Sequence, residues 1–315
     1  MVTRYGLISD IHTAKLDDVL RGIDVLKDEG IDELILNGDL SWGVSDKNGR
    51  EFFNIDNFEK LIEYVAKQDI PTYFLPGDKD NFSKFEAYVS FFSFKNPHIF
   101  YTIDRPVIHK KDHTLIFLPG GEVEDGFSLE DSIYETGRYE WARGGFFRII
   151  NMNDLKKYMK DVDDPEKAIL FSHIPIKFNT LRAVDVDEAF VDDSFKYNEK
   201  YRCFKKGYLS LKDAKLGSLK QRSTQDYIPK NVGSSDLEKI VKDVGIKKHI
   251  TGHTHYSVHR AHDLHENPVN ENEWTNELFF MASYMDKLKL GMIDVDENRV
   301  RYFRVNLKDY IKGPL

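Results

Sequence analysis

The first eighty residues alternate between short apolar runs and amphipathic helical patterns, and this alternation restricts the fold more than any other feature of the chain. Three apolar runs, 4–9, 33–37 and 71–75, have the length of buried strands. Between them, Leu, Ile and Val recur at helical spacing over 16–26 and 58–65. Successive strand–helix–strand units with right-handed crossovers place their strands parallel in one sheet. The sequence therefore predicts an α/β fold with a mostly parallel sheet.

Aspartate or histidine follows each of these apolar runs, and also follows a later run at 168–172. The side chains concerned are Asp10, His12, Asp39, Asp78 and His173. In open α/β sheets, ligands bind outside the carboxyl ends of the strands. An aspartate at a strand end often only caps a turn, and a lone histidine is usually ordinary polar structure. The repetition of the same two residue types at successive strand ends is what predicts a ligand site.

The apolar stretch that begins at Lys248 ends in Gly-His-Thr-His. In extended backbone, residues two apart point to the same side, so His253 and His255 can direct two imidazoles at one place. Gly252 lets the backbone turn there without a Cβ clash. Imidazole is a favoured ligand for Zn, Fe, Ni and similar ions. Paired loop histidines are also common on polar surfaces, so this motif gains its weight from the strand-end residues.

Together these positions supply seven metal-competent side chains, which are too many for one tetrahedral ion. They suit two ions that share a carboxylate, as in hydrolytic sites with ions ~3.5–4 Å apart. Three carboxylates against two divalent cations leave net positive charge. That charge would attract a phosphate ester and lower the pKa of a bridging water.

With these motifs in place, the chain resembles the calcineurin-like metallophosphoesterase superfamily. The resemblance covers residues 4 to about 262 and is carried by Asp10-Ile11-His12, Gly38-Asp39, Gly77-Asp78-Lys79-Asp80, His173 and Gly252-His253-Thr254-His255. It implies a four-layer α/β/β/α sandwich of two mixed sheets, with a dinuclear site at its edge. It also implies that Asp10, His12 and His255 hold one ion, that Asp78, His173 and His253 hold the other, and that Asp39 bridges them.

The resemblance implies a phosphoric ester hydrolase in which a metal-bridging hydroxide attacks phosphorus in line. The expected cofactors are two divalent ions among Mn, Fe, Zn and Ni, with manganese favoured. The expected substrate is a small phosphoester or a nucleotide. Two alternatives stay open: a non-catalytic metal-binding interaction protein on the same scaffold, and a nuclease.

Two departures from the family pattern fall at the third strand end, where the family usually has Gly-Asn-His-Asp or Gly-Asn-His-Glu. Asp78 replaces a neutral amide with an anion, which should tighten the second ion and reduce its Lewis acidity. Lys79 replaces a histidine, and we expect it to act either as an electrostatic clamp on phosphoryl oxygens or as an inert solvent-facing residue. Lysine is a poor general acid near neutral pH, so a phosphodiesterase is favoured over a phosphomonoesterase. The second aspartate that usually follows Gly-Asp is also missing, since Ser41 lies in that stretch.

A basic segment, 196–222, lies within an irregular insertion, 176–232, between two ligand-bearing strands. It contains nine Lys or Arg against two acidic residues, and tyrosines and a phenylalanine interleave with them. The segment is either a substrate lid, in which Lys205 and Lys206 bind an anionic group, or a solvated surface insertion.

We expect residues 1–315 to form a single domain, of which 266–315 is a β-rich part. Three β-like runs in that part, at 278–282, 288–295 and 299–305, are predicted to pair antiparallel. The region 120–147 is rich in acidic and aromatic residues, and its apolar residues follow no clear helical or strand periodicity. It is expected to be a loop.

Composition restricts the binding partners and the cellular compartment that are expected for the chain. The chain has 45 basic and 53 acidic residues, a net charge of −8, so broad coating of nucleic acid or anionic membrane is not expected. Its one cysteine excludes an internal disulfide and a Cys-rich zinc site. With no apolar leader and no run of 18 apolar residues, a cytoplasmic protein is expected. The triplet His259, His262 and His265 is either a third metal site or a set of polar loop residues.

Overall fold

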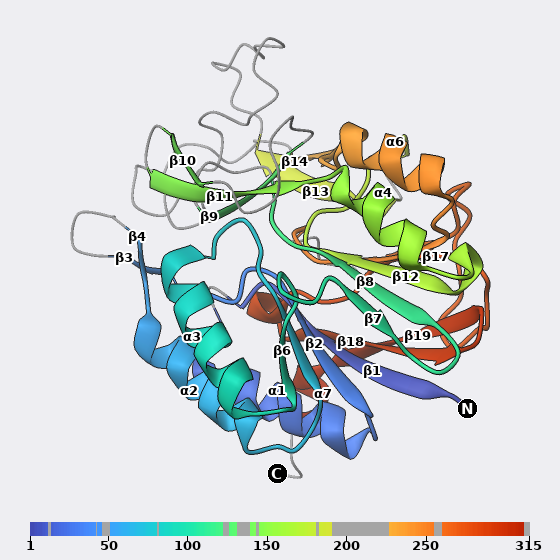
Figure 1. The fold of residues 1–315 in the computed structure, drawn as a ribbon. Coiled ribbons are helices and arrows are strands. Elements are labelled where there is room, and N and C mark those ends of the chain that lie inside the picture. The colour runs from blue at the N-terminus through green and yellow to red at the C-terminus, as the bar shows by residue number, and fades with distance from the viewer. Residues whose placement is uncertain are drawn as a thin grey trace.

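The computed structural model of the chain is shown in Figure 1. It describes residues 1–11, 14–41, 43–45, 51–80, 82–121, 126–130, 139–142, 145–180, 183–190, 227–254 and 260–311. Among these residues, no helix has both the length and the apolar character needed to cross a membrane.

The first of two six-stranded sheets has the order β19-β18-β1-β2-β5-β6. Its parallel strands are β1 (Thr3–Ile8), β2 (Glu33–Asn37), β5 (Thr72–Leu75) and β6 (Ile99–Tyr101). Strands β18 (Lys289–Asp296) and β19 (Arg299–Asn306) join antiparallel at one edge. Helices α1 (Leu16–Asp28), α2 (Ile55–Ala66), α3 (Phe82–Lys95) and the short α7 (Leu307–Ile311) lie along its outer side (Figure 1). The predicted parallel strands at the start of the chain are confirmed.

The second sheet has the order β16-β17-β15-β12-β8-β7. Strands β17 (Leu278–Met281), β15 (Lys248–Thr251), β12 (Ala168–Ser172) and β8 (Thr114–Leu118) run parallel. Strands β16 (Ala261–His262) and β7 (Val107–His109) are its antiparallel edges. Helices α4 (Asp154–Tyr158) and α6 (Ser235–Val244) cover its outer side, and short 3-10 turns occupy Met159–Asp161, Pro165–Lys167 and Met285–Lys287.

The two sheets pack face to face, which produces the four-layer α/β/β/α sandwich of two mixed sheets. Alternation along the strands makes this arrangement possible, because successive side chains point to opposite faces. In β1, Tyr5 and Leu7 enter the core between the sheets, whereas Ile8 packs with the helices. In β12, Phe171 faces the inner core and Leu170 faces the outer one. The expected fold class is therefore confirmed.

The C-terminal runs differ in part from the prediction. Strands β18 and β19 are antiparallel as expected, but β17 runs parallel to β15 in the other sheet. The three runs therefore do not form one antiparallel unit. Their pairing is set by which sheet buries each apolar face, and a single sequence carries little information about that choice.

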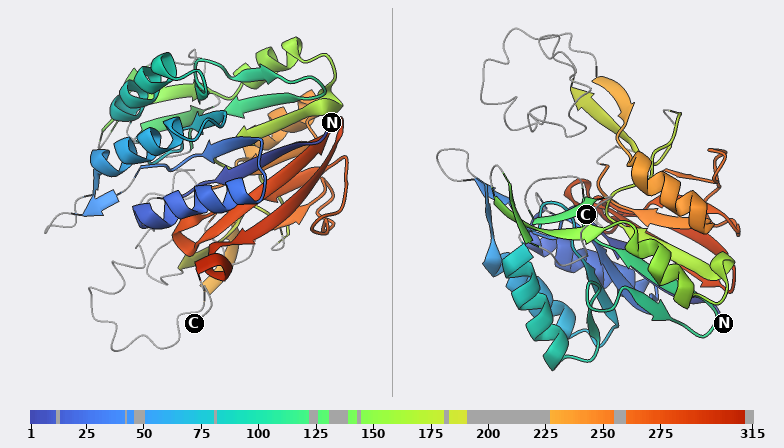
Figure 2. Two further views of the ribbon diagram at one scale, coloured as in Figure 1. Left: turned by 90° about the horizontal axis from the view of Figure 1, so that it is seen from below. Right: turned by 45° about the horizontal axis from the view of Figure 1, so that its top comes forward.

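Three smaller sheets lie outside the sandwich. The expected loop region 120–147 contains most of a three-stranded sheet of β10 (Tyr139–Ala142), β11 (Gly145–Asn151) and β9 (Gly126–Glu130). Strands β3 (Gly43–Ser45) and β4 (Glu51–Phe53) form a short pair. Within the insertion 176–232, β13 (Val186–Phe190) and β14 (Tyr227–Asn231) pair antiparallel as a hairpin that projects from the body (Figure 2, right).

Candidate metal centre

The turns that follow β1, β2, β5, β12 and β15 meet at one edge of the sandwich, and each carries a residue that the sequence singled out. Backbone bonds connect the turns directly. The N–H of Asp10 donates to the carbonyl of Gly38 at 3.1 Å, and the N–H of Gly252 donates to the carbonyl of His173 at 3.0 Å. Between the sheets, Nδ2 of Asn37 in β2 donates to the carbonyl of Ser172 in β12 at 3.2 Å, so strands from both sheets build one site.

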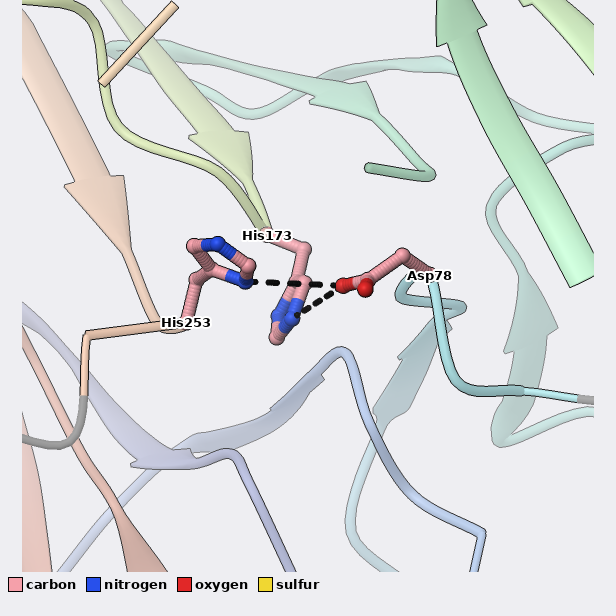
Figure 3. A group of neighbouring side chains, drawn as sticks. All are labelled: Asp78, His173 and His253. Carbon is pink, nitrogen blue, oxygen red and sulfur yellow. Dashed lines mark ion pairs between the residues drawn. The ribbon is translucent and has the colours of Figure 1, made fainter. Parts of the chain in front are cut away.

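One group of side chains at this site consists of Asp78, His173 and His253. Nε2 of His173 lies 3.1 Å from Oδ1 of Asp78, and Nδ1 of His253 lies 3.4 Å from the same oxygen. Figure 3 shows both imidazoles directed at this carboxylate. The ligand atoms of the three residues lie within 4.8 Å of one another, so the group could hold a metal ion.

A second group consists of Asp10, Asp39 and His173, whose ligand atoms also lie within 4.8 Å of one another. His173 belongs to both groups, because its Nε2 lies 3.3 Å from Oδ1 of Asp39. All three side chains are buried. The structure therefore brings together the five described members of the predicted ligand set.

The orientation of the His173 ring is fixed by one hydrogen bond. Its Nδ1 lies 3.2 Å from the carbonyl oxygen of Asn37. Because a carbonyl can only accept, Nδ1 carries a proton and donates it. When the ring is neutral, the lone pair is therefore on Nε2, which faces Asp39 and Asp78. A hydrogen bond of this kind selects the tautomer that a metal-binding histidine needs.

Charge at the site is balanced between the carboxylates and the imidazoles. Burial alone would raise the pKa of Asp78, but the nearby imidazoles of His173 and His253 hold that pKa well below its usual range. Burial alone would lower the pKa of His173, but the negative charge of Asp39 and contacts with Asp78 raise it well above its usual range. The site therefore favours a positive charge among its buried carboxylates.

Several buried polar atoms of the site make no hydrogen bond within the described part of the chain. They are both carboxylate oxygens of Asp78 and Nε2 of His173. Buried polar atoms are normally paired, so unpaired atoms that face one another indicate an interaction beyond the protein. Carboxylate oxygens and imidazole nitrogens are the donors that Mn, Fe, Zn and Ni accept. These residues therefore fit divalent cations.

The backbone of the site is strained at three of the predicted ligand residues. Asp10, Asp39 and His253 have φ angles of 54°, 52° and 69°. This left-handed region is unfavourable for L-residues and is found mainly where surrounding structure enforces it, often at functional sites.

Two glycines allow the close packing of the site. A Cβ at Gly38 would lie 2.3 Å from Nδ1 of His173, and a Cβ at Gly121 would lie 2.5 Å from Cβ of Asp78. At Gly121 no side chain would fit unless Asp78 or the turn moved. The reason is steric, since the backbone of Gly121 lies against the Asp78 side chain.

Several supporting residues were missed by sequence reasoning. Asp80 is buried and accepts hydrogen bonds from the N–H of Gly77 at 2.8 Å and from Oγ of Ser41 at 2.6 Å. Burial and the nearby charge of Asp39 raise the pKa of Asp80 to about 7. Ser9 donates its hydroxyl to Oδ2 of Asp10 at 2.5 Å. Asp80 belongs to the Gly-Asp-Lys-Asp motif, which is a usable signal, whereas nothing in the sequence marks Ser9 or Ser41 as partners.

Lys79 lies at the rim of the site. Its side chain is 49% exposed, and its Nζ is 3.8 Å from Oδ2 of Asp78. Its backbone N–H donates to Oδ1 of Asp39 at 2.9 Å. Lys79 therefore contacts the site both through its backbone N–H and through its half-exposed ammonium.

Four other predicted site residues, His12, His255, Lys205 and Lys206, lie outside the described residues. Of the histidine triplet, His259 also lies outside them. His262 is buried with both ring nitrogens engaged: Nε2 accepts from the N–H of Val184 at 3.1 Å, and Nδ1 contacts the carbonyl of Asp263 at 2.7 Å. These contacts support the structural interpretation of His262 over a third metal site.

Comparison with known proteins places this geometry in context. Over 157 residues, the chain is 25% identical to a Fervidobacterium nodosum protein named glutamate–tRNA ligase 2, a match that covers 47% of this chain and 31% of that protein. The chain thus spans about a third of the length of this curated relative. The solved structure of TT1561 of Thermus thermophilus aligns with 98% of this chain and 100% of its own, with a TM-score of 0.56 and 10% identity. A further solved structure aligns with 96% of this chain and 99% of its own, with a TM-score of 0.52 and 13% identity.

At these identities the structural likeness shows a shared fold. The family model of the calcineurin-like phosphoesterases matches residues 3–257, a range that includes every predicted ligand and both sheets in part. The chain therefore belongs to the calcineurin-like phosphoesterase family, a group of metal-dependent hydrolases.

Proposed function

We propose that this chain hydrolyses phosphoric esters and that its predicted ligand set holds two divalent cations. In this proposal Asp10, His12 and His255 hold one cation, Asp78, His173 and His253 hold the other, and Asp39 bridges the two. The observation that carries the proposal is the group of Asp78, His173 and the part-exposed His253, whose ligand atoms lie within 4.8 Å of one another. Both carboxylate oxygens of Asp78 and Nε2 of His173 are buried there without a hydrogen bond in the described part of the chain. When bound, the cations would supply Lewis acidity that lowers the pKa of a water and neutralises charge on a phosphoryl group.

The protein itself orients the carboxylates that would bind the cations. Asp39 is held by the N–H of Lys79, which fixes the carboxylate oxygen Oδ1 that lies 3.3 Å from Nε2 of His173. Asp10 is held through its Oδ2 by the hydroxyl of Ser9 and by the N–H of His253, at 2.5 and 3.1 Å. Because these partners are buried or part-buried, the carboxylates need little rearrangement when a cation binds.

We propose that Lys79 acts as an electrostatic clamp on the substrate. Its ammonium is half exposed beside Asp78, where it could approach a phosphoryl oxygen that enters from solvent. A lysine in this place is a poor proton donor near neutral pH. We therefore propose a phosphodiesterase with substrates that carry good leaving groups, in preference to a phosphomonoesterase.

We propose manganese as the first choice of metal, with Fe, Zn and Ni as the others. Carboxylates favour Mn, and imidazoles also suit Zn, Fe and Ni. We also propose a single domain over 1–315, because the C-terminal strands β17, β18 and β19 complete both sheets. A lid over 176–232, with Lys205 and Lys206 as substrate contacts, stays a prediction.

A direct test supplies Mn, Fe, Zn or Ni in turn to the metal-stripped protein. Activity is then measured on bis-p-nitrophenyl phosphate, p-nitrophenyl phosphate and a cyclic nucleotide. We expect two equivalents of metal, highest turnover with Mn and faster cleavage of the diester. Metal uptake without turnover on any ester would support the non-catalytic alternative. Failure to bind any of the four metals would overturn the proposal.

A further inference from the structure

The turn that carries His253 is strained and is held by specific contacts. His253 has a φ of 69°, which side chains other than glycine rarely adopt. Its N–H donates to Oδ2 of Asp10 at 3.1 Å, and the N–H of Thr254 donates to the carbonyl of Gly252 at 2.9 Å. A strained turn persists only when its surroundings hold it in place.

The side chain of Thr254 supplies one such contact, since its hydroxyl lies between the carbonyl of Val184 and Sδ of Met281. Thr254 is fully buried, and its hydroxyl donates to the carbonyl of Val184 at 3.0 Å. Val184 lies in the insertion 176–232, seventy residues before Thr254. The turn that carries His253 is therefore attached to a segment that the sequence left as irregular.

The Val184 segment is itself fixed by the chain that follows the histidine turn. The N–H of Val184 donates to Nε2 of His262 at 3.1 Å. The guanidinium of Arg260 donates to the carbonyl of Ala183 at 3.0 Å. Since Ala183, Val184 and His262 are all buried, these bonds are shielded from competition with water.

Asp185 then ties this segment to the base of the hairpin. Its carboxylate is buried and accepts from the N–H of Phe178 and from Nδ2 of Asn231, both at 2.9 Å. Its carbonyl accepts from the N–H of Val232 at 2.7 Å. Strands β13 and β14 begin and end beside these residues, so Asp185 fixes the base of the hairpin seen in Figure 2. The carbonyl of Val184, directly before Asp185, is thereby held in position for Thr254.

We propose that Thr254 is a positioning residue for His253, and that Asp185 fixes the carbonyl to which Thr254 is attached. The inference rests on the proposed function, in which His253 is a metal ligand. It assigns to the hairpin base a role in supporting the metal centre. Loss of a group that hydrogen-bonds a metal ligand directly typically costs 10–100-fold in affinity. Thr254 acts one step further out, through the turn, so its effect is expected at the lower end of that range.

The test compares Thr254→Val, which removes the hydroxyl at nearly constant volume, with Thr254→Ser, which keeps it. Binding of Mn²⁺ to the metal-stripped proteins is measured by titration calorimetry, and bound Mn²⁺ is counted after gel filtration. We expect Thr254→Val to weaken one of two Mn²⁺ sites about 10-fold or more. We expect Thr254→Ser to bind as the unsubstituted protein does.

Thr72→Val is the matched control. Thr72 is also buried and donates its hydroxyl to a backbone carbonyl, that of Ile70 at 3.0 Å, but it lies at the start of β5, at the end of the strand away from the centre. We expect this variant to lose stability without any change in Mn²⁺ affinity. Equal weakening in Thr72→Val and Thr254→Val would overturn the inference, because it would assign the effect to general destabilisation.

If Thr254→Val does not fold, Asp185→Asn replaces it in the test. This variant disturbs the hydrogen bonds beside the Val184 carbonyl, which is the acceptor for Thr254, and leaves Thr254 itself unchanged. We expect Asp185→Asn to weaken the same Mn²⁺ site by a smaller factor. Unchanged binding of both equivalents in this variant and in Thr254→Val would show that the hairpin base does not support His253. Absence of Mn²⁺ binding in the unsubstituted protein is a different result, because it would contradict the proposed function itself.

Discussion

Nε2 of His173 lies 3.1 Å from Oδ1 of Asp78, and both side chains are fully buried. Neither atom makes a hydrogen bond within the described part of the chain. Asp78 stands where the family usually has a neutral asparagine, so this chain places one more negative charge beside His173. The extra charge should bind a cation more tightly and make it a weaker Lewis acid.

Asp78→Asn tests this relationship. We expect the variant to hold one of its two Mn²⁺ ions roughly tenfold more weakly, a change of about 1.4 kcal/mol, because ligand charge sets affinity for divalent cations. At saturating Mn²⁺ we expect an equal or higher kcat. Titration calorimetry and steady-state kinetics on a diester measure the two effects. Tighter binding in the variant would contradict the assignment of Asp78 as a ligand.

Lys79→Ala tests the proposed clamp. Loss of a half-exposed cation at the rim should lower kcat/KM on the order of tenfold, less than loss of a fully buried donor would. We expect Lys79→Arg to recover most of the activity and Mn²⁺ content to stay unchanged. Lys84→Ala, at an exposed lysine on α3, is the control. Unchanged turnover in Lys79→Ala would show that Lys79 is an inert surface residue.

Strand periodicity predicted the fold well where neighbouring strands are joined by one helix. The parallel strands β1, β2 and β5 follow directly from apolar runs and amphipathic spacing. Helix α3 was not predicted, because aromatic residues such as Phe85, Tyr88 and Phe91 occur around most of its surface and hide its period. The parallel pairing of β17 with β15 was missed for another reason. The sheet that a strand joins depends on which apolar face is buried in the folded protein.

The aspartates and histidines that meet at the candidate site could be identified from the sequence, whereas the contacts that support them could not. Asp39 and His173 meet because each follows a strand at the same edge of the sandwich, and strand ends are visible in the sequence. The support of His173 by the carbonyl of Asn37, and of the histidine turn by Val184, depends on backbone positions. Backbone carbonyls carry no residue-specific signal, so only a three-dimensional structure identifies them.

Gly121→Ala tests the steric role of the turn after β8. The added Cβ would lie 2.5 Å from Cβ of Asp78, so the Asp78 carboxylate or the turn must shift. We expect a loss of about 1–3 kcal/mol in the free energy of unfolding, as in other overpacked sites, together with weaker Mn²⁺ binding. In Gly22→Ala, a control in helix α1, the atoms nearest to the added Cβ belong to Leu290, at 3.3 Å, and to Met285, which are not predicted ligands. That control should keep Mn²⁺ affinity; equal Mn²⁺ affinity in both variants would exclude the steric role.

His249 predicts a pH dependence of stability that does not involve the metal. Its Nε2 lies 2.6 Å from Oγ of Ser172, whose hydroxyl donates to the carbonyl of Ile174, so Nε2 carries a proton and donates to Ser172. Burial lowers the pKa of His249 to about 3, whereas the imidazole in an unfolded chain has a pKa near 6.5. Between these values only the unfolded state takes up the extra proton, so the free energy of unfolding falls as the pH falls.

From pH 7.5 to 5.5, this single group should remove about 1.4 kcal/mol from the free energy of unfolding. Urea denaturation of the metal-stripped protein across this range measures the slope, and His249→Gln should reduce the slope by that amount while lowering stability at every pH. His265→Gln, at an exposed histidine, is the control for removal of an imidazole. An identical slope in His249→Gln and the unsubstituted protein would show that folding does not change the pKa of His249, which would contradict the preference of the buried site for the neutral ring.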